Sequence, residues 1–370
     1  MKPKIIVDAI ALLSPLSGIG RYTYEVAKVL AESKDYTVNY YYGYFSEELT
    51  ISNHIESVKF IKKVIHRIPF SRPIIHRLMF YISWITSPYY KLYWQPNFIF
   101  NDGIKAQKRV VTIHDFSWEI YPEFHPKERI DYFQKNFYAS VKRCDHIITG
   151  SEFTKHEIIQ RTGISSDKIS VIYHGIDHTL FYPRTHHHIP KQKYILSVGS
   201  IEPRKNLKNL LLAYELLDSS IKDEYHLILV GAQGWKNDEI VGLMKKLDKW
   251  VQYSGFVSDE ALSSLYSEAT LFVYPSLYEG FGIPPLEAMA CGTAVIVSNA
   301  STLPEVCDDA AFYVDPMDIE AIKNGILTVL NNEALREDLI QKGLQRAKEF
   351  SWEKSALEHQ KVFEKVLFKG

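Results

Sequence analysis

The stretch YEGFGIPPLEAM, residues 278–289, carries two carboxylates eight positions apart, Glu279 and Glu287, with two glycines and two prolines between them. The apolar run at 271–274 predicts a buried strand. The prolines suit the first turn of a helix, where a missing N–H costs nothing. Glu279 is therefore expected in a loop and Glu287 in the first turns of a helix whose N–H groups and dipole favour an anion. Carboxylates that accept hydroxyl hydrogen bonds beside a place for phosphate indicate a sugar nucleotide.

Short apolar segments alternate with helical patterns along the chain, which is typical of βαβ units and parallel sheets in an α/β protein. We expect strands at 4–7, 38–42, 110–113, 146–149 and 169–172 in the first half, and at 194–198, 226–230, 251–253, 271–274 and 294–297 in the second. So many strands exceed one doubly wound sheet, so two sheets are predicted, with ligands at the carboxyl ends of their strands.

The proline-containing segment 183–192 lacks an apolar period and predicts the domain boundary. We expect a first domain at 1–188, a second at 189–350, and a final helix at 351–367 with Ser351 as N-cap. The histidine run 186–188 is read as a solvated linker in preference to a metal site.

The bulk composition points away from several classes of protein. The net charge of −1 gives no global field for nucleic acid, and three widely spaced cysteines suggest a reducing compartment without a disulfide framework. No run approaches the roughly 20 apolar residues that span a bilayer. A cytoplasmic protein is expected, with possible attachment to the inner face of the cytoplasmic membrane.

Two further segments place polar side chains where predicted strands end. Arg204 and Lys205 follow the strand at 194–198 and Gly199, and such cations grip phosphate oxygens. His114 ends the strand at 110–113, at the edge of the sheet where ligands bind. The alternatives are a surface basic pair and a structural histidine.

The Glu279-x7-Glu287 spacing resembles the E-x7-E signature of a large family of retaining glycosyltransferases, the family 4-like enzymes, in the manner of bacterial O-antigen mannosyltransferases. The segment 199–206 resembles the G-x-x-x-x-R-K-N element of this family, and 111–115 its V-H-D element. The resemblance implies a GT-B fold, in which two Rossmann-like domains face each other across a cleft and the final helix, 351–370, packs back on the first domain.

The resemblance also implies roles for individual residues. Arg204 and Lys205 would neutralise the departing diphosphate, Glu287 would bind ribose hydroxyls, and Glu279 would bind the donor sugar near His114. Further donor-binding residues would be Gly199, Gly255, Phe256, Val257, Gly280, Phe281, Gly282 and Ile283. Near the acceptor and diphosphate the family has a loop and a serine that match Gly18, Gly20, Arg21 and Ser151. Ser151 also fits a helix N-cap.

No metal or other cofactor is expected, because the chain has no Asp-x-Asp pair and fixed cations can stabilise the leaving group. The serine-rich version of the segment 298–305 tilts the donor toward GDP-mannose. The expected partners are a nucleotide sugar and a glycan or polyprenyl-linked oligosaccharide, and the expected reaction is transfer of a hexose to a sugar hydroxyl during surface polysaccharide synthesis.

Four alternatives stay open. They are a transferase that uses a UDP-sugar, an epimerase or hydrolase of nucleotide sugars, a non-catalytic membrane scaffold that binds nucleotide sugars, and a dinucleotide oxidoreductase. The last lacks the full glycine fingerprint and the acidic residue that should follow a second strand.

One segment is informative without any family. Residues 57–101 contain seven Lys or Arg and no Asp or Glu, with many aromatic side chains. The part at 61–68 predicts a basic amphipathic helix of the type that lies on anionic lipid. We therefore expect membrane contact through 57–94, against the alternative that the apolar stretch 74–85 packs in the core.

Overall fold

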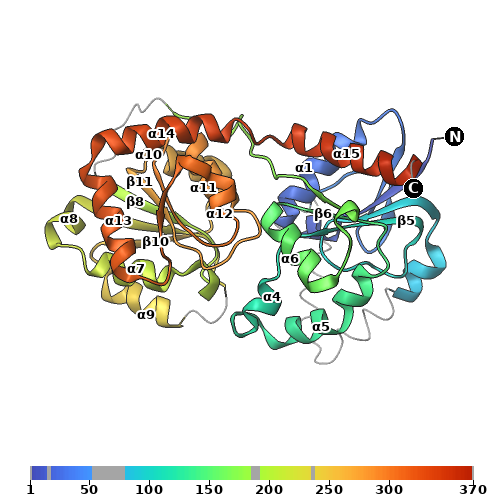
Figure 1. The fold of residues 1–370 in the computed structure, drawn as a ribbon, viewed down its shortest axis with the longest axis horizontal. Coiled ribbons are helices and arrows are strands. Elements are labelled where there is room, and N and C mark those ends of the chain that lie inside the picture. Colours follow the sequence, from blue (N-terminus) through green and yellow to red (C-terminus); the bar gives the residue numbers. More distant parts are fainter. Residues whose placement is uncertain (1, 15–17, 52–79, 185–191, 235–237, 369–370) are drawn as a thin grey trace.

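The computed structural model describes residues 2–14, 18–51, 80–184, 192–234 and 238–368. They form two lobes, each built on one sheet (Figure 1). The chain is therefore an α/β protein with two Rossmann-like sheets, as predicted. The predicted boundary at 188/189 and the histidine run lie outside the described residues.

The first sheet has the strand order β3-β2-β1-β4-β5-β6-β7, and all neighbours are parallel except β2 and β3. Its strands are β1 (Lys4–Asp8), β2 (Thr37–Tyr41), β3 (Phe45–Ser46), β4 (Tyr89–Gln95), β5 (Lys105–Ile113), β6 (His146–Thr149) and β7 (Ile169–Val171). Alternate residues of β1 face opposite sides, so Ile5 and Val7 pack with one layer of helices and Ile6 with the other.

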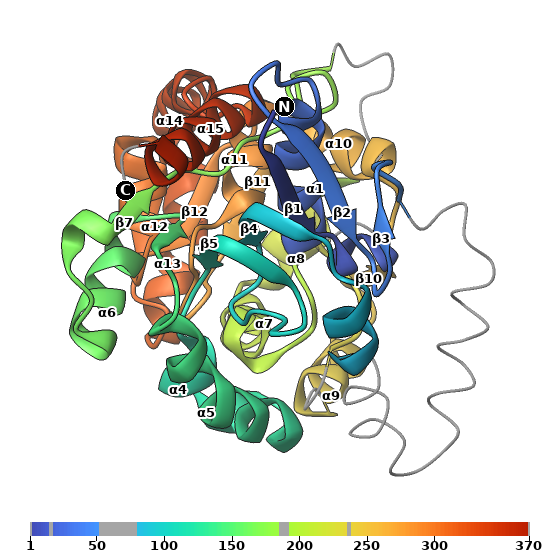
Figure 2. The same cartoon turned by 90° about the vertical axis from the view of Figure 1, so that its right-hand side faces the viewer.

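Helices cover both faces of this sheet. One face packs against α1 (Ile19–Ala31) and α15 (Trp352–Phe368), and the other against α4 (Ser117–Ile120), α5 (Lys127–Val141) and α6 (Glu152–Thr162). Figure 2 shows α15 above the sheet and α4 and α5 below it.

The second sheet has the order β10-β9-β8-β11-β12-β13 and is parallel throughout. Its strands are β8 (Lys193–Val198), β9 (Tyr225–Val230), β10 (Val251–Gly255), β11 (Leu271–Tyr274), β12 (Val295–Ser298) and β13 (Phe312–Val314). The helices are α7 (Leu207–Glu215), α8 (Ser219–Glu224), α9 (Asp238–Lys246), α10 (Asp259–Glu268), α11 (Ile283–Ala290), α12 (Leu303–Cys307), α13 (Ile319–Asn331) and α14 (Glu333–Ala347).

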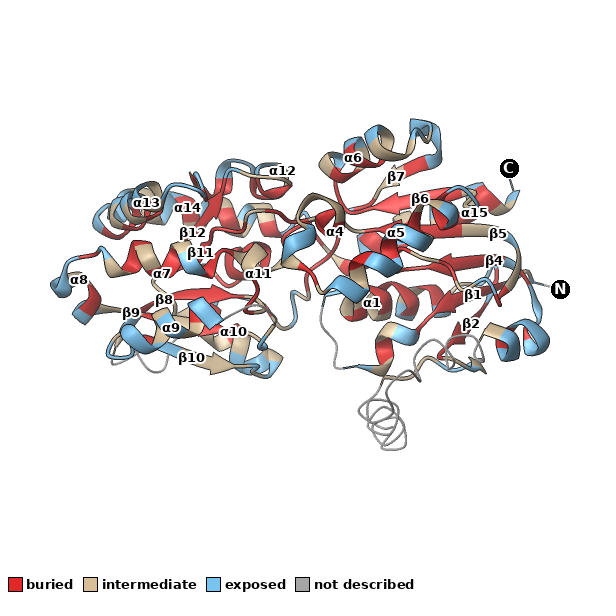
Figure 3. Ribbon diagram, turned by 90° about the horizontal axis from the view of Figure 1, so that it is seen from below, coloured by how far each residue is buried: buried red, intermediate tan, exposed pale blue. Residues whose placement is uncertain are grey.

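The central strands of both sheets are buried, edge strands such as β3, β10 and β13 are only partly buried, and the outer faces of the helices are exposed (Figure 3). In the second domain, α7, α9 and α13 pack on one face of the sheet and α10, α11 and α12 on the other. The core is thus three layers deep in each lobe, which is the doubly wound arrangement.

The chain crosses between the domains twice, and the two crossings run side by side. Ile176 in the first crossing forms a parallel β-bridge with Ser351 in the second. A Cβ on Gly175 would lie 2.2 Å from the backbone nitrogen of Trp352, so the close approach requires glycine there. Ser351 caps α15, as predicted, by accepting a hydrogen bond from the Lys354 N–H at 3.2 Å.

Helix α15 returns to the first domain. Its Trp352, Ala356 and Phe363 side chains are buried with Trp94 of β4. His359 accepts a hydrogen bond from the Tyr22 hydroxyl at its Nε2, 2.6 Å away, since its Nδ1–H donates to the Ser355 carbonyl at 2.7 Å. The first domain is therefore built from both ends of the chain.

The prediction of membrane contact through 57–94 was wrong for the last residues of that segment. Residues 89–94 belong to β4, a central strand in which Tyr90, Tyr93 and Trp94 are buried. Tyrosine and tryptophan have high strand propensity as well as an affinity for membrane interfaces, so the pattern fits both. The short strands β3 and β13 were also not predicted. Residues 57–79 of the predicted segment lie outside the described residues, and 80–86 form a short helical turn.

Candidate active site

Glu279 lies in a loop between β11 and α11, at the carboxyl end of the second sheet. Its carboxylate accepts four hydrogen bonds, from Arg204 Nη1 at 2.7 Å, Lys205 Nζ at 2.7 Å, the Tyr274 hydroxyl at 2.8 Å and the Ser276 hydroxyl at 2.7 Å. The structure therefore brings together the three residues that the sequence placed at the donor diphosphate and donor sugar.

The charges in this cluster are buried and balanced. Arg204 also donates to Glu202 Oε1 at 2.8 Å, so two cations face two carboxylates. Burial by itself raises the pKa of Glu279, but the charges of Arg204 and Lys205 outweigh it and lower that pKa to about 2. Burial likewise lowers the pKa of Lys205, against the pull of Glu279. An arriving diphosphate would compete with Glu279 and Glu202 for these cations.

The loop that carries Glu279 is held from behind by the segment 298–305. The Ser301 hydroxyl accepts a hydrogen bond from the Glu279 N–H at 2.9 Å, and the Thr302 hydroxyl donates to the Phe281 carbonyl at 2.9 Å. Ser301 and Thr302 of this serine-rich segment thus have a local structural role. Asn206 holds two further loops by donating to the Pro275 and Pro316 carbonyls.

His114 faces the same loop from the first domain. A Cβ on Gly280 would lie 1.9 Å from the His114 carbonyl oxygen, so only glycine permits this approach of the two domains. The His114 ring hydrogen-bonds to the Pro96 carbonyl through Nε2 at 2.7 Å, which makes Nε2 the donor. Burial lowers the pKa of His114 and favours the neutral ring, leaving Nδ1 as an acceptor.

Ser151 acts as the N-cap of α6 and also faces the second domain. Its hydroxyl accepts a hydrogen bond from the Thr154 N–H at 3.1 Å and lies 3.2 Å from the Gly280 carbonyl. Glu305 of α12 accepts hydrogen bonds from the N–H groups of Glu152 and Phe153 at 2.7 and 3.0 Å. The second domain therefore supplies hydrogen-bond acceptors for some of the backbone N–H groups at the start of α6.

Tyr278, next to Glu279, joins the domains through its hydroxyl. It donates to the buried carboxylate of Glu157 in α6 and accepts from the Phe116 N–H at 2.9 Å. Its carbonyl accepts from Arg204 at 2.8 Å. Sequence reasoning missed Tyr278 and Glu157, because a buried glutamate within a polar helix gives no signal of a partner 121 residues away.

Glu287 lies on α11, the helix that follows the loop. Its carboxylate accepts a hydrogen bond from the buried Tyr266 hydroxyl at 3.0 Å. Burial raises the pKa of Glu287 to about 7, although the charge of Arg21 acts in the opposite direction. Arg21 itself forms an ion pair with Asp259 of α10, which links the domains on this side.

The remaining predicted residues lie at or close to the ends of strands and helices. Gly18 begins α1 with a positive φ, and Gly20 is buried inside that helix. Gly199 follows β8 and lies against the side chain of Lys205. Gly255 ends β10, and Phe256 after it is 66% exposed. Gly282 and Ile283 form the start of α11, and Phe281 is buried against His174.

Both halves of the chain are similar to known proteins. Residues 16–180 match the model for Glycosyltransferase Family 4, and residues 181–346 match the model for glycosyl transferases group 1. O-antigen chain mannosyltransferase B of Escherichia coli is 35% identical over 95% of this chain and 96% of its own length. The chain belongs to the family 4 glycosyltransferases. O-antigen chain mannosyltransferase RfbU of Salmonella typhimurium is also 35% identical, over 60% of this chain and 61% of that protein.

Solved structures agree on the GT-B fold of this glycosyltransferase. Sucrose-phosphate synthase from Thermosynechococcus elongatus is 19% identical, with a TM-score of 0.73 over the whole of both chains. WaaG, a glycosyltransferase involved in lipopolysaccharide biosynthesis, is 15% identical, with a TM-score of 0.67 over 98% of this chain and 99% of that one. The predicted architecture is therefore confirmed.

Proposed function

We propose that this glycosyltransferase moves mannose from GDP-mannose to a sugar hydroxyl of a growing surface glycan, with retention of the anomeric configuration. The observation that carries the proposal is the buried cluster of Glu279, Arg204 and Lys205 beside His114, in a chain whose full-length relative is an O-antigen mannosyltransferase. The mannosyltransferase names among the relatives support the choice of sugar.

The cluster suits a reaction in which a diphosphate leaves. The bond between the donor C1 and the phosphate oxygen breaks while a bond from C1 to the acceptor oxygen forms on the same face. The acceptor's proton passes to the departing phosphate oxygen. Arg204 and Lys205 stabilise the charge that develops there without reorganising, and they need no metal for this. Glu279 then binds donor hydroxyls, and Glu287 those of the ribose.

Arg204→Ala and Lys205→Ala test the role of the cations. Removing one well-placed donor to a developing charge costs about 100- to 1000-fold in turnover. The measurement is the rate of GDP release with GDP-mannose and a mannose-terminated acceptor, in buffer with and without EDTA. Lys208→Ala is the matched control, because Lys208 is exposed and pairs with Glu239 at 2.7 Å. Near-wild-type rates in Arg204→Ala would rule out the assignment.

A panel of nucleotide sugars tests the donor. A ligand at 100 times its dissociation constant should stabilise the protein by about 2.7 kcal/mol. GDP-mannose is expected to raise the unfolding temperature, and NMR of the product should show the donor's anomeric configuration. A shift with a UDP-sugar and none with GDP-mannose would overturn the choice of donor. Inversion in the product, or a trapped covalent adduct on Asp or Glu, would overturn the same-face mechanism.

We also propose that the protein contacts the inner face of the cytoplasmic membrane and uses a lipid-linked acceptor there. Among the described residues no helix is both long and apolar enough to cross a bilayer. The helical turn at 80–86 nevertheless exposes a group of large apolar side chains, Tyr81, Ile82, Trp84 and Ile85. Such side chains insert at the headgroup level of a lipid surface. Trp84→Ser with Ile85→Ser should reduce co-sedimentation with vesicles containing phosphatidylglycerol, and unchanged sedimentation would refute the contact.

A further inference from the structure

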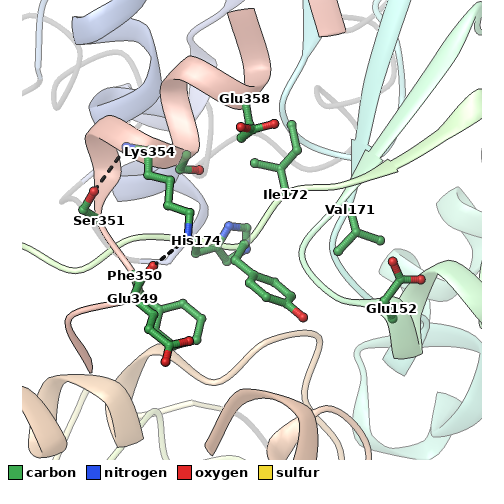
Figure 4. A pocket seen from close by; sticks show the side chains of 11 residues that line it. Glu152, Val171, Ile172, His174, Glu349, Phe350, Ser351, Lys354 and Glu358 are labelled. Carbon is green, nitrogen blue, oxygen red and sulfur yellow. Dashed lines mark hydrogen bonds between the residues drawn. The ribbon is translucent and has the colours of Figure 1, made fainter. Parts of the chain in front are cut away.

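The ring of His114 is packed against other rings that hold its plane. Tyr22 and Phe98 meet it edge-on, with ring centroids 5.2 and 5.5 Å away, and the ring of His174 lies 5.8 Å away. His174 also lines a pocket between the end of β7 and the start of α15 (Figure 4). Packing of this kind fixes the plane of the His114 ring, but it would accept the ring equally well after a half turn about its bond to Cβ.

The carbonyl of Pro96 decides between these two orientations. It accepts a hydrogen bond from His114 Nε2 at 2.7 Å, and after a half turn a carbon of the ring would face this oxygen instead. The hydrogen bond made by one nitrogen of a histidine sets the role of the other, so Nδ1 is left as the acceptor. The position of one backbone carbonyl thus determines what His114 offers to a ligand.

The turn that carries Pro96 is strained at Phe98. The φ of Phe98 is 60°, in the left-handed region that a bulky side chain rarely adopts. The Phe98 N–H donates to the Thr112 carbonyl at 3.0 Å, which ties the turn to the strand that ends beside His114. A strained backbone of this kind persists only where its surroundings hold it firmly, and it is frequent at functional sites.

Gln95, the last residue of β4, holds this turn with its side-chain amide. Its Oε1 accepts a hydrogen bond from the Asn97 N–H at 3.0 Å, and its Nε2 donates to the Ile99 carbonyl at 3.0 Å. The amide therefore pairs with the backbone on both sides of Phe98. Its Nε2 also donates to Asp8 Oδ2, 3.1 Å away.

Asp8 ends β1, the strand beside β4, and fixes the position of the Gln95 amide. Its carboxylate also accepts hydrogen bonds from the Tyr93 hydroxyl at 3.0 Å and from the Ile10 N–H at 3.2 Å. Burial raises the pKa of Asp8 to about 6, while these hydrogen bonds act in the opposite direction. A buried carboxylate needs such donors, so Asp8, Tyr93 and Gln95 hold one another in place.

We propose that Gln95 and Asp8 are positioning residues for the transfer reaction. They hold the turn at 96–99 so that the Pro96 carbonyl keeps His114 with Nδ1 available to the donor sugar. The contact between His114 and the sugar rests on the proposed function. Neither Gln95 nor Asp8 has to touch a substrate, because the effect passes through the backbone of the turn. Moving a positioned group by about 1 Å can lower a rate about 100-fold, so the turn has a kinetic consequence.

Gln95→Met tests the proposal, since it keeps the length of the side chain and removes the amide. Long-range nitrogen–proton NMR of isotope-labelled protein, without any ligand, reports which nitrogen of His114 carries the hydrogen. The wild type should show the Nε2–H form, and the variant a mixture of both forms. With GDP-mannose and an acceptor, kcat should fall about 10- to 100-fold, while KM for GDP-mannose stays near the wild-type value because Arg204 and Lys205 are untouched. Gln107→Met is the matched control, because Gln107 is exposed on β5.

A double-mutant cycle separates this role from a general structural one. If Gln95 acts through His114, Gln95→Met should lower kcat in the wild type and have little further effect in His114→Ala. A merely structural role would lower kcat by the same factor in both backgrounds. Asp8→Asn keeps the size of the side chain and one acceptor oxygen. It should change the His114 tautomer and kcat in the same direction but by less, and it carries the test if Gln95→Met does not fold.

An unchanged tautomer or an unchanged kcat in these variants would overturn the proposal. So would the same loss of kcat with and without His114. Failure of every nucleotide sugar to support transfer would refute the proposed function alone, because the tautomer of His114 is measured without any donor.

Discussion

Glu279→Gln removes the negative charge that Arg204 and Lys205 share, while it keeps the size of the side chain. Burial acts to raise the pKa of Glu279, yet the two cations bring it from 4.5 to about 2. At 1.36 kcal/mol for each pKa unit, the charged carboxylate stabilises the fold by about 3 kcal/mol. Because the folded pKa is the lower one, this stabilisation is present above pH 4.5 and is lost as the pH falls toward 2.

Urea denaturation at pH 7, followed by tryptophan fluorescence, measures the effect. The free energy of unfolding of Glu279→Gln should fall by about 3 kcal/mol relative to the wild type. GDP should bind the variant more tightly, because the diphosphate no longer competes with the carboxylate, while transfer is lost with the sugar contact. Glu239→Gln is the matched control, since Glu239 is exposed in its ion pair with Lys208 and should matter little. Equal stabilities of Glu279→Gln and wild type at pH 7 would refute the electrostatic account.

Three further predictions concern the groups around this cluster. Burial raises the pKa of Glu287 from 4.5 to about 7. The contribution of this carboxyl group to the stability of the fold is therefore full below pH 4.5 and is lost as the pH rises through 7. Glu287→Gln should unfold at a higher temperature than the wild type at pH 8, with a smaller difference at pH 5. Tyr278→Phe should cost about 1–3 kcal/mol in urea denaturation, because the buried Glu157 carboxylate loses its donor, whereas Tyr182→Phe at the surface should be neutral. Gly175→Ala should lower the unfolding temperature by forcing the crossings apart, while Gly242→Ala, with open space around it in α9, should hold or raise it.

Much of the fold is predictable because buried parallel strands appear in the sequence as short apolar runs. Strands β6 and β11 have the predicted bounds, and the other predicted strands differ by a few residues at their ends. Strand β4 was not predicted because its tyrosines and lysine read as an interfacial segment. Its burial depends on the flanking strands β1 and β5, and β1 lies in a distant part of the sequence.

The sequence indicates which residues form the candidate site, but it does not indicate which of them contact one another. Arg204, Lys205 and Glu279 each follow a strand, so their shared edge of the sheet follows from topology. That Glu279 pairs with both cations depends on loop conformations set by Asn206, Ser301 and their partners. The contacts between the domains, such as that of Tyr278 with Glu157, depend on how the two lobes pack against each other. A local sequence pattern does not determine this packing.

The return of α15 to the first domain has a consequence for the order in which the protein matures. Helix α15 contributes Trp352, Ala356, Val362, Phe363 and Val366 to a core whose other buried members lie between Ile5 and Ile172. During synthesis, the second domain can fold as soon as it leaves the ribosome, but the first must wait for the last helix. Until then its apolar face stays open to chaperones and proteases, so a premature stop before residue 352 leaves the amino-terminal half exposed although most of its residues have been made.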